Sequence, residues 1–188
     1  MPDAPRTYLL IDGENIDATL GMSVLGRRPA PEERPRWDRI LDFAHVAFDQ
    51  PAKGLFFLNA SSGQMPMNFV QALLAMDFHP IPLSGSATEK VVDIGIQRTL
   101  EAIAKQPYGD VLLASHDGDF LPQVEALVDA GRDVGIICFR EFVNSHLTEL
   151  TSRGLRIYDL EDDLGAFQAP LPRVRIIPLE SFDPTRYL

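Results

Sequence analysis

Short apolar runs alternate along the chain with longer segments in which apolar residues recur every three or four positions. The short runs predict strands at 7–11, 54–59, 79–83, 110–115 and 133–139, and a sixth at 156–160. The longer segments predict helices at about 36–49, 65–77, 88–105, 120–130 and 144–152. Strands that alternate with helices are typical of a parallel sheet covered by helices on both faces, so this pattern predicts an α/β fold.

Two of these segments carry finer signals. The predicted strand at 79–83 contains two prolines, which lack the amide hydrogen that a central strand needs, so it should lie at an edge of the sheet. Ser86 and Glu89 are three residues apart and predict a capping box at the start of the helix at 88–105. One apolar stripe of this helix should face the sheet, formed by Val92, Ile96, Leu100 and Ile103.

The domain organisation follows from length and periodicity. A chain of 188 residues provides one full-sized core and is short for two domains, so we expect one domain at 1–164. After Gly165 the sequence contains four prolines and loses its periodicity, which predicts an extended tail at 165–188. We expect this tail to pack on the domain or on a partner, including a second copy of the chain.

Composition and charge narrow the classes of function. No apolar run approaches the roughly 18 residues that span a bilayer, and the N-terminus lacks the basic and apolar pattern of a secretory signal. We therefore expect a protein that does not enter membranes. The single cysteine, Cys138, excludes an intramolecular disulfide and a cysteine-rich metal site, which favours a cytoplasmic location. The net charge of −10 argues against a domain that grips long polyanions through a positive field, but it permits an enzyme that meets phosphates through bound cations.

Four aspartates follow the predicted strands in a suggestive way. Asp12 ends the first strand, Asp117 and Asp119 follow the fourth, and Asp93 lies in the first turns of the helix after the third. Because the carboxyl ends of parallel strands meet at one edge of a sheet, we expect all four at that edge. Aspartate and glycine are also ordinary turn formers, which accounts equally well for the loop at 117–119 taken alone.

Such a group of carboxylates is expected to need a cation. The four charges would repel one another and raise their own pKa values, unless a metal ion lies between them. Oxygen ligands favour Mg²⁺ or Mn²⁺ over zinc. Such an ion can polarise a phosphodiester and activate water, so the reaction class predicted from these residues is phosphodiester hydrolysis.

Three motifs in this order resemble those of NYN domains, which belong to the PIN-like nucleases: IDGENI at 11–16, KVVDIGI at 90–96 and SHDGDF at 115–120. The resemblance spans most of 7–160. It implies a three-layer, PIN-like (Rossmann-like) α/β fold with a central parallel sheet of five to six strands and the core order 3-2-1-4-5. It also implies a metal-dependent ribonuclease that takes RNA, with Mg²⁺ or Mn²⁺ held by Asp12, Asp93, Asp117 and Asp119.

The resemblance further implies roles for the neighbours of these ligands. Asn15 would act as a polar orienter, Lys90 would contact phosphate and Ser115 would support the loop. The chain departs from the usual family pattern at Val91 and His116, where glycine is more frequent. Many members of the LabA-like branch, which the chain resembles, have no known substrate.

An arginine-rich segment at 26–39 stands out in this acidic chain. Its arginines and the interleaved Trp37 could hold single-stranded RNA through phosphate contacts and stacking, and we expect Arg27 and Arg28 to bind substrate. The alternative is a surface loop whose positive charge is largely cancelled by Glu32, Glu33 and Asp38.

Other functions remain open from the residues alone. A Toprim-like phosphotransfer enzyme would use Glu14 with Asp117 and Asp119, and would give Asp93 no ligand role. A catalytically silent interaction module would bind partners through the tail and the segment that contains Met65, Met67 and Met76. His116 could contact substrate or shuttle protons, or simply be a loop histidine in solvent.

Overall fold

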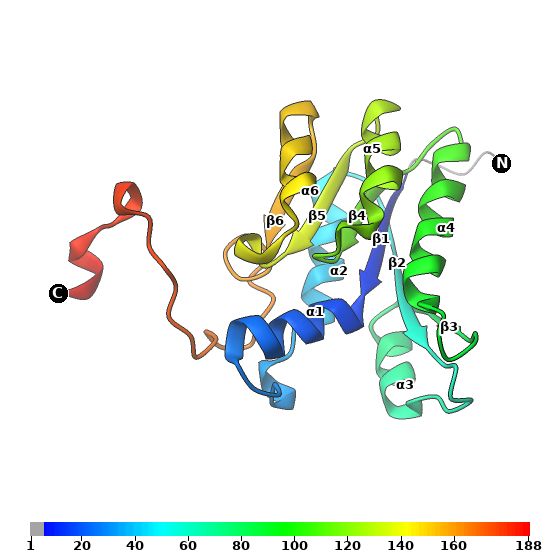
Figure 1. Cartoon of the computed structure of the whole chain (residues 1–188), viewed down its shortest axis with the longest axis horizontal. Coiled ribbons are helices and arrows are strands. Elements are labelled where there is room, and N and C mark those ends of the chain that lie inside the picture. Colours follow the sequence, from blue (N-terminus) through cyan, green and yellow to red (C-terminus); the bar gives the residue numbers. More distant parts are fainter. Residues whose placement is uncertain (1–5) are drawn as a thin grey trace.

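The computed structural model describes residues 6–188 and shows a three-layer α/β domain (Figure 1). Six strands form one parallel sheet in the order β3-β2-β1-β4-β5-β6. The strands are β1 (Thr7–Asp12), β2 (Ala52–Asn59), β3 (Phe78–Leu83), β4 (Asp110–Ala114), β5 (Val134–Cys138) and β6 (Arg156–Asp159). This confirms the predicted fold class and the core order 3-2-1-4-5, with β6 added beside β5.

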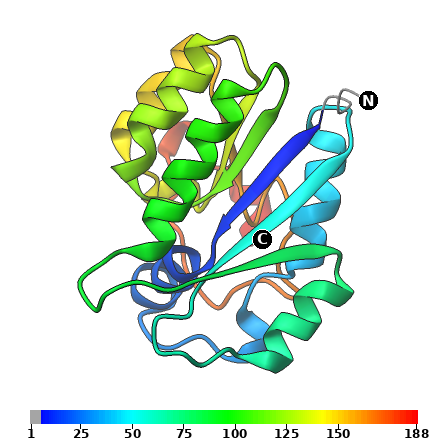
Figure 2. The same ribbon diagram turned by 90° about the vertical axis from the view of Figure 1, so that its right-hand side faces the viewer.

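Helices cover both faces of the sheet, as Figure 2 shows for α4 and α2. One apolar core lies under α4 (Val91–Lys105), α5 (Leu121–Asp129) and α6 (Ser145–Glu149). The other lies under α1 (Gly13–Thr19), α2 (Trp37–Ala47) and α3 (Met67–Ala75). The central strands β1, β4 and β5 are apolar along almost their whole length because both of their faces are buried.

The detailed predictions for α4 have mixed outcomes. All four residues of the predicted stripe are buried against the sheet, and β3 lies at the sheet edge as its prolines require. The prediction of a capping box is wrong, because α4 begins at Val91 and both Ser86 and Glu89 lie before it. The amide of Ser86 donates to Glu89 Oε1 over 2.8 Å, so this pair closes a turn in the preceding loop.

Sequence patterns missed the segment between β1 and α2. It contains α1 and a π-helical stretch, Leu20–Leu25, that continues it. Asp12 caps α1, since its Oδ1 accepts a hydrogen bond from the amide of Asn15. The helix is only seven residues long and buries Ile16, which is too few apolar positions for a periodic signal.

The C-terminal part of the chain changes character near residue 175. Ala166, Phe167 and Leu171 are buried in the core beside α1 and α2, whereas Val174 and Ile176 are almost fully exposed. Figure 1 shows the chain after this point leaving the domain and ending far from the sheet. The division into a domain at 1–164 and a tail at 165–188 stays a prediction.

The three methionines of the proposed partner-binding segment differ in burial. Met76 packs partly against the core, while Met65 and Met67 are exposed in this chain. Within residues 6–188, no helix combines the length and the apolar character needed to cross a bilayer.

Candidate metal centre

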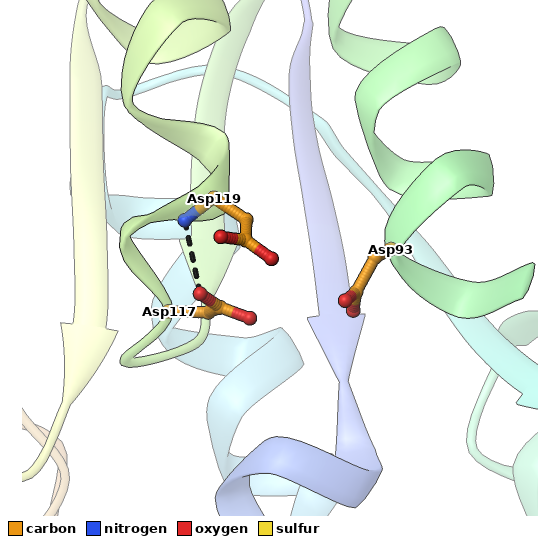
Figure 3. Close-up of side chains that lie close together, drawn as sticks. All are labelled: Asp93, Asp117 and Asp119. Carbon is orange, nitrogen blue, oxygen red and sulfur yellow. Dashed lines mark hydrogen bonds between the residues drawn. The ribbon is translucent and has the colours of Figure 1, made fainter. Parts of the chain in front are cut away.

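Three of the predicted carboxylates meet over the end of β1. Asp93 comes from the first turn of α4, and Asp117 and Asp119 come from the loop after β4. Figure 3 shows their side chains pointing toward one another. Each offers one carboxylate oxygen that lies within 4.8 Å of the other two, so the group could hold a metal ion.

Asp12 lies beside this group and is nearly completely buried. Its Oδ2 accepts a hydrogen bond of 3.0 Å from the hydroxyl of Ser115, and its Oδ1 faces the amide of Asn15. Burial raises the pKa of Asp12 to about 7 against the effect of the Ser115 hydrogen bond, and the charges of Asp93 and Asp117 add to the rise. Asp12 is therefore close enough to sense the other carboxylates.

Asp93 also has a raised pKa. Burial raises its pKa, the charge of Asp117 adds to this rise, and the ammonium of Lys90 opposes it. Lys90 Nζ lies 3.9 Å from Asp93 Oδ2 and 3.6 Å from Asp119 Oδ2, and its side chain is 73% exposed. An exposed pair of this kind contributes about 0–1 kcal/mol, so Lys90 offsets only part of the repulsion.

The loop that carries Asp117 and Asp119 is a turn, and it also brings its carboxylates to the candidate metal site. Asp117 Oδ1 accepts a hydrogen bond of 2.9 Å from the amide of Asp119, as the turn-former interpretation predicts (Figure 3). The amide of Asp117 donates in turn to Ser115 Oγ over 3.1 Å. A side chain at Gly118 would displace Asn144, because a Cβ atom there would lie 2.5 Å from the side-chain nitrogen of Asn144. The turn thus holds its two aspartates with their carboxylates toward Asp93.

Asn15 and His116 connect the two loops behind these carboxylates. Asn15 Oδ1 accepts hydrogen bonds from the backbone amide of His116 over 2.8 Å and from its Nδ1 over 2.9 Å. His116 Nε2 accepts from the amide of Phe139 over 2.8 Å, which places the ring proton on Nδ1. Burial lowers the pKa of His116 to about 4, so the ring is neutral. His116 is therefore a buried, hydrogen-bonded residue and not a solvated one, and its roles in substrate contact and proton transfer stay predictions.

The comparison with protein families agrees with this geometry. The family model of the NYN domain matches residues 6–156, which contain all four aspartates. The chain belongs to the NYN domain family. NYN domains are PIN-like nucleases, which suggests a hydrolase, and the match does not distinguish the LabA-like branch. A comparison with curated proteins finds no match.

The arginine-rich segment of this NYN domain is mostly engaged in local contacts. Arg27 forms a two-pronged ion pair with Glu33, Arg34 pairs with Asp17, and Arg36 pairs with Asp38. Trp37 is half-buried, and its ring packs against Phe56 in a T-shaped contact at a centroid distance of 5.0 Å, so part of its surface is already engaged in the core. Most of the positive charge of this segment is thus paired with nearby acidic side chains, as the alternative of a charge-balanced surface loop predicts.

A pocket nevertheless remains beside this segment. It has a volume of about 510 Å³ and is lined by residues of α1, the π-helical stretch and the arginine loop, namely Asp17, Ala18, Gly21, Met22, Gly26, Arg27 and Arg28. Among residues 6–188, Arg28 forms no ion pair, so its charge is available to a ligand at this pocket.

The donor set of the NYN domain fits a hard divalent cation. Carboxylate oxygens from three positions approach one another, and burial, with a smaller effect from the neighbouring carboxylates, raises the pKa of Asp12 and Asp93. Lys90 is a single positive charge beside these four acids. A cation would remove the remaining repulsion, and oxygen-only donors suit Mg²⁺ or Mn²⁺.

Proposed function

We propose that this NYN domain is a ribonuclease that hydrolyses phosphodiester bonds of single-stranded RNA with Mg²⁺ or Mn²⁺. The observation that carries the proposal is the convergence of Asp93, Asp117 and Asp119 beside the buried Asp12. This point lies where the strand order reverses between β1 and β4, the position at which open α/β sheets bind ligands.

Each residue of the site has a role in this proposal. Asp93, Asp117 and Asp119 would hold the ion together with Asp12, which supplies a fourth carboxylate at the end of β1. A bound divalent ion activates water and stabilises charge on the phosphate. Ser115 keeps Asp12 and the Asp117 loop in register through its two hydrogen bonds. Asn15 joins the loop after β1 to the loop after β4.

Lys90 is the proposed phosphate contact. Its ammonium lies 3.6 Å from Asp119 and is mostly exposed, so it can turn toward a substrate when a metal ion neutralises the carboxylates. Because lysine is a flexible point charge, it suits a phosphate oxygen whose position changes during the reaction.

The pocket at Arg27 and Arg28 is the proposed substrate subsite. Its volume falls in the usual range for small-ligand sites, and the guanidinium of Arg28 offers donors for a phosphate. The net charge of −10 gives the protein no general attraction for RNA, so binding must depend on such local contacts and on metal ions. Membership of the NYN family supports RNA as the substrate class.

The test is cleavage of a labelled single-stranded RNA by purified protein with millimolar Mn²⁺ or Mg²⁺. Cleavage should stop on chelation, and Asp93→Asn and Asp117→Asn should each remove most of it. The matched control is Asp42→Asn, since Asp42 is an exposed aspartate on α2, across the sheet from α4. Full activity of the Asp117→Asn protein would refute the proposed mechanism.

Two outcomes would favour the alternatives. Metal binding without cleavage of any RNA tested would favour a catalytically silent NYN-like module. Loss of phosphotransfer in Asp117→Asn with full activity in Asp93→Asn would favour the Toprim-like scheme, in which Asp93 has no ligand role. The position of Asp93, with a carboxylate oxygen within 4.8 Å of those of Asp117 and Asp119, favours the ribonuclease.

A further inference from the structure

His116 forms a junction of three segments that are distant in sequence. Its backbone amide and Nδ1 both donate to Asn15 in α1, and its Nε2 accepts from the amide of Phe139 at the end of β5. The residue itself precedes Asp117 directly. A change in the position of this ring would therefore move the loop of Asp117 relative to the helix that begins after Asp12.

The ring of His116 belongs to an aromatic stack that continues into the C-terminal segment. It lies parallel to Phe139, with a centroid distance of 5.8 Å and an interplanar angle of 9°. Phe139 stacks in turn on Phe167 at 5.8 Å and 21°. The guanidinium of Arg173 lies 5.6 Å from the centroid of the Phe139 ring. Such aromatic and cation–π contacts favour a fixed arrangement of the rings.

The segment at 166–175 is itself firmly attached to the domain. The side chain of Arg173 is only 8% exposed and forms ion pairs with Glu141 and Glu161. Arg39 donates to the carbonyl of Phe167 over 2.9 Å, and the amide of Arg36 donates to the carbonyl of Ala166 over 2.6 Å. The segment that packs on the far side of Phe139 is thus held in place by these contacts.

We propose that His116 is a positioning residue of the carboxylate site, and that the segment at 166–175 holds its ring in place through Phe139. This inference rests on the proposed function, because it names what orients the same site. The acidic side chains repel one another, which favours opening of the loops that carry them. The hydrogen bonds of His116 to Asn15 and Phe139 oppose this opening, and they do not use the carboxylate oxygens that an ion would need.

The two bonds of the ring can be separated by isosteres. His116→Asn retains an amide near the place of Nδ1 and so keeps a donor to Asn15. His116→Gln reaches the place of Nε2 and keeps an acceptor for the amide of Phe139. Ile103→Val is the stability control, because Ile103 is a buried residue at the opposite end of the helix that carries Asp93.

The primary measurement is amide hydrogen exchange in peptides that cover 12–20 and 113–120, in chelator. With His116→Gln we expect exchange there to be about tenfold faster, as for the loss of one buried hydrogen bond. His116→Asn keeps the bond to Asn15 but loses the ring stack and the acceptor for the amide of Phe139, so its exchange should be about threefold to fivefold faster than the parent's and slower than that of His116→Gln. Ile103→Val should leave these peptides unchanged. Unchanged exchange in His116→Gln would overturn the proposal, as would equal acceleration in the Ile103→Val control.

The C-terminal arm is tested by Arg173→Lys, which keeps the charge near Glu141 and Glu161 but removes the planar contact with Phe139. Exchange at 113–120 should accelerate severalfold in this variant, while Arg186→Lys, in the exposed tail, should have no effect. Equal exchange in the two lysine variants would refute the role of the segment.

Metal affinity and turnover then connect the junction to the site. Calorimetric titration with Mn²⁺ should show about fivefold weaker binding by His116→Gln than by His116→Asn. If the parent cleaves RNA, kcat should fall in the same order with little change in KM. A parent that neither binds Mn²⁺ nor cleaves RNA would refute the proposed function, whereas the exchange experiment would still decide the structural role of His116.

Discussion

The charge of Asp117 can be removed without removing its turn, which makes this residue a sharp test of the metal site. Asp117 Oδ1 accepts the amide of Asp119, and asparagine caps such turns as well as aspartate does. Asp117→Asn therefore retains the hydrogen bond and deletes one negative charge. Two unit charges about 5 Å apart repel by roughly 1 kcal/mol in water and by about 3 kcal/mol at an effective dielectric constant of about 20.

The lower value applies here because Asp117 is half-buried, Asp119 is exposed and Lys90 lies nearby. In chelator, the Asp117→Asn protein should be about 1 kcal/mol more stable than the parent. For a domain of this size the corresponding rise in Tm is about 2–4 °C. A metal ion at about a hundredfold its Kd adds about 2.7 kcal/mol to the parent, so in Mn²⁺ the parent should melt higher than the variant.

Differential scanning fluorimetry of three proteins, with and without Mn²⁺, measures this reversal. Asp42→Asn is the control and should follow the parent in both conditions. A parent whose Tm does not change in millimolar Mn²⁺ would refute the metal site. A lower Tm of Asp117→Asn in chelator would contradict the reasoning. It would show that the charge of Asp117 stabilises the turn by more than repulsion from the neighbouring carboxylates destabilises it.

Three further predictions concern pH, RNA and the C-terminal segment. The raised pKa of Asp12, about 7, means that the folded protein binds more protons than the unfolded chain between about pH 4 and pH 7. Stability in chelator should therefore fall as the pH rises from about 4 to about 7 and level off above 7, and Asp12→Asn should flatten this dependence in thermal melts. Changing Arg27 and Arg28 together to Ala should weaken RNA binding severalfold and lower its salt dependence in fluorescence anisotropy, with unchanged Mn²⁺ affinity. Phe167→Ala should lower the free energy of unfolding by about 3 kcal/mol in urea titrations, whereas deletion of 177–188 should change it by less than about 0.5 kcal/mol.

The fold was predictable because its signals are local and repeated. Strands such as β4 consist of consecutive apolar residues because both faces are covered, and α4 shows one continuous stripe. The short α1 escaped detection because its seven residues bury too little apolar surface to produce a period. Ser86 and Glu89 matched a helix start in spacing, yet the same hydrogen bond closes a loop equally well.

The candidate site was predictable only in part, for a different reason. Asp12, Asp93 and the Asp117 loop follow elements whose order in the sheet determines their proximity. The role of His116 depends on Asn15 and Phe139, which lie 101 and 23 residues away, so no local spacing could indicate it. Stacking of Trp37 on RNA stays a prediction, and its contact with Phe56 joins two residues far apart in sequence, so no local pattern could indicate it.

The double use of Asp117 has a consequence for how this domain can change over generations. One carboxylate oxygen closes the turn, and an amide oxygen would close it as well. A single-base change converts an aspartate codon to an asparagine codon, and the product would retain its shape while losing an acidic ligand. If the proposed ribonuclease activity depends on this carboxylate, a variant that loses the activity would not lose stability as well. Descendants with asparagine here should persist as folded proteins, available for recruitment to tasks that require only recognition.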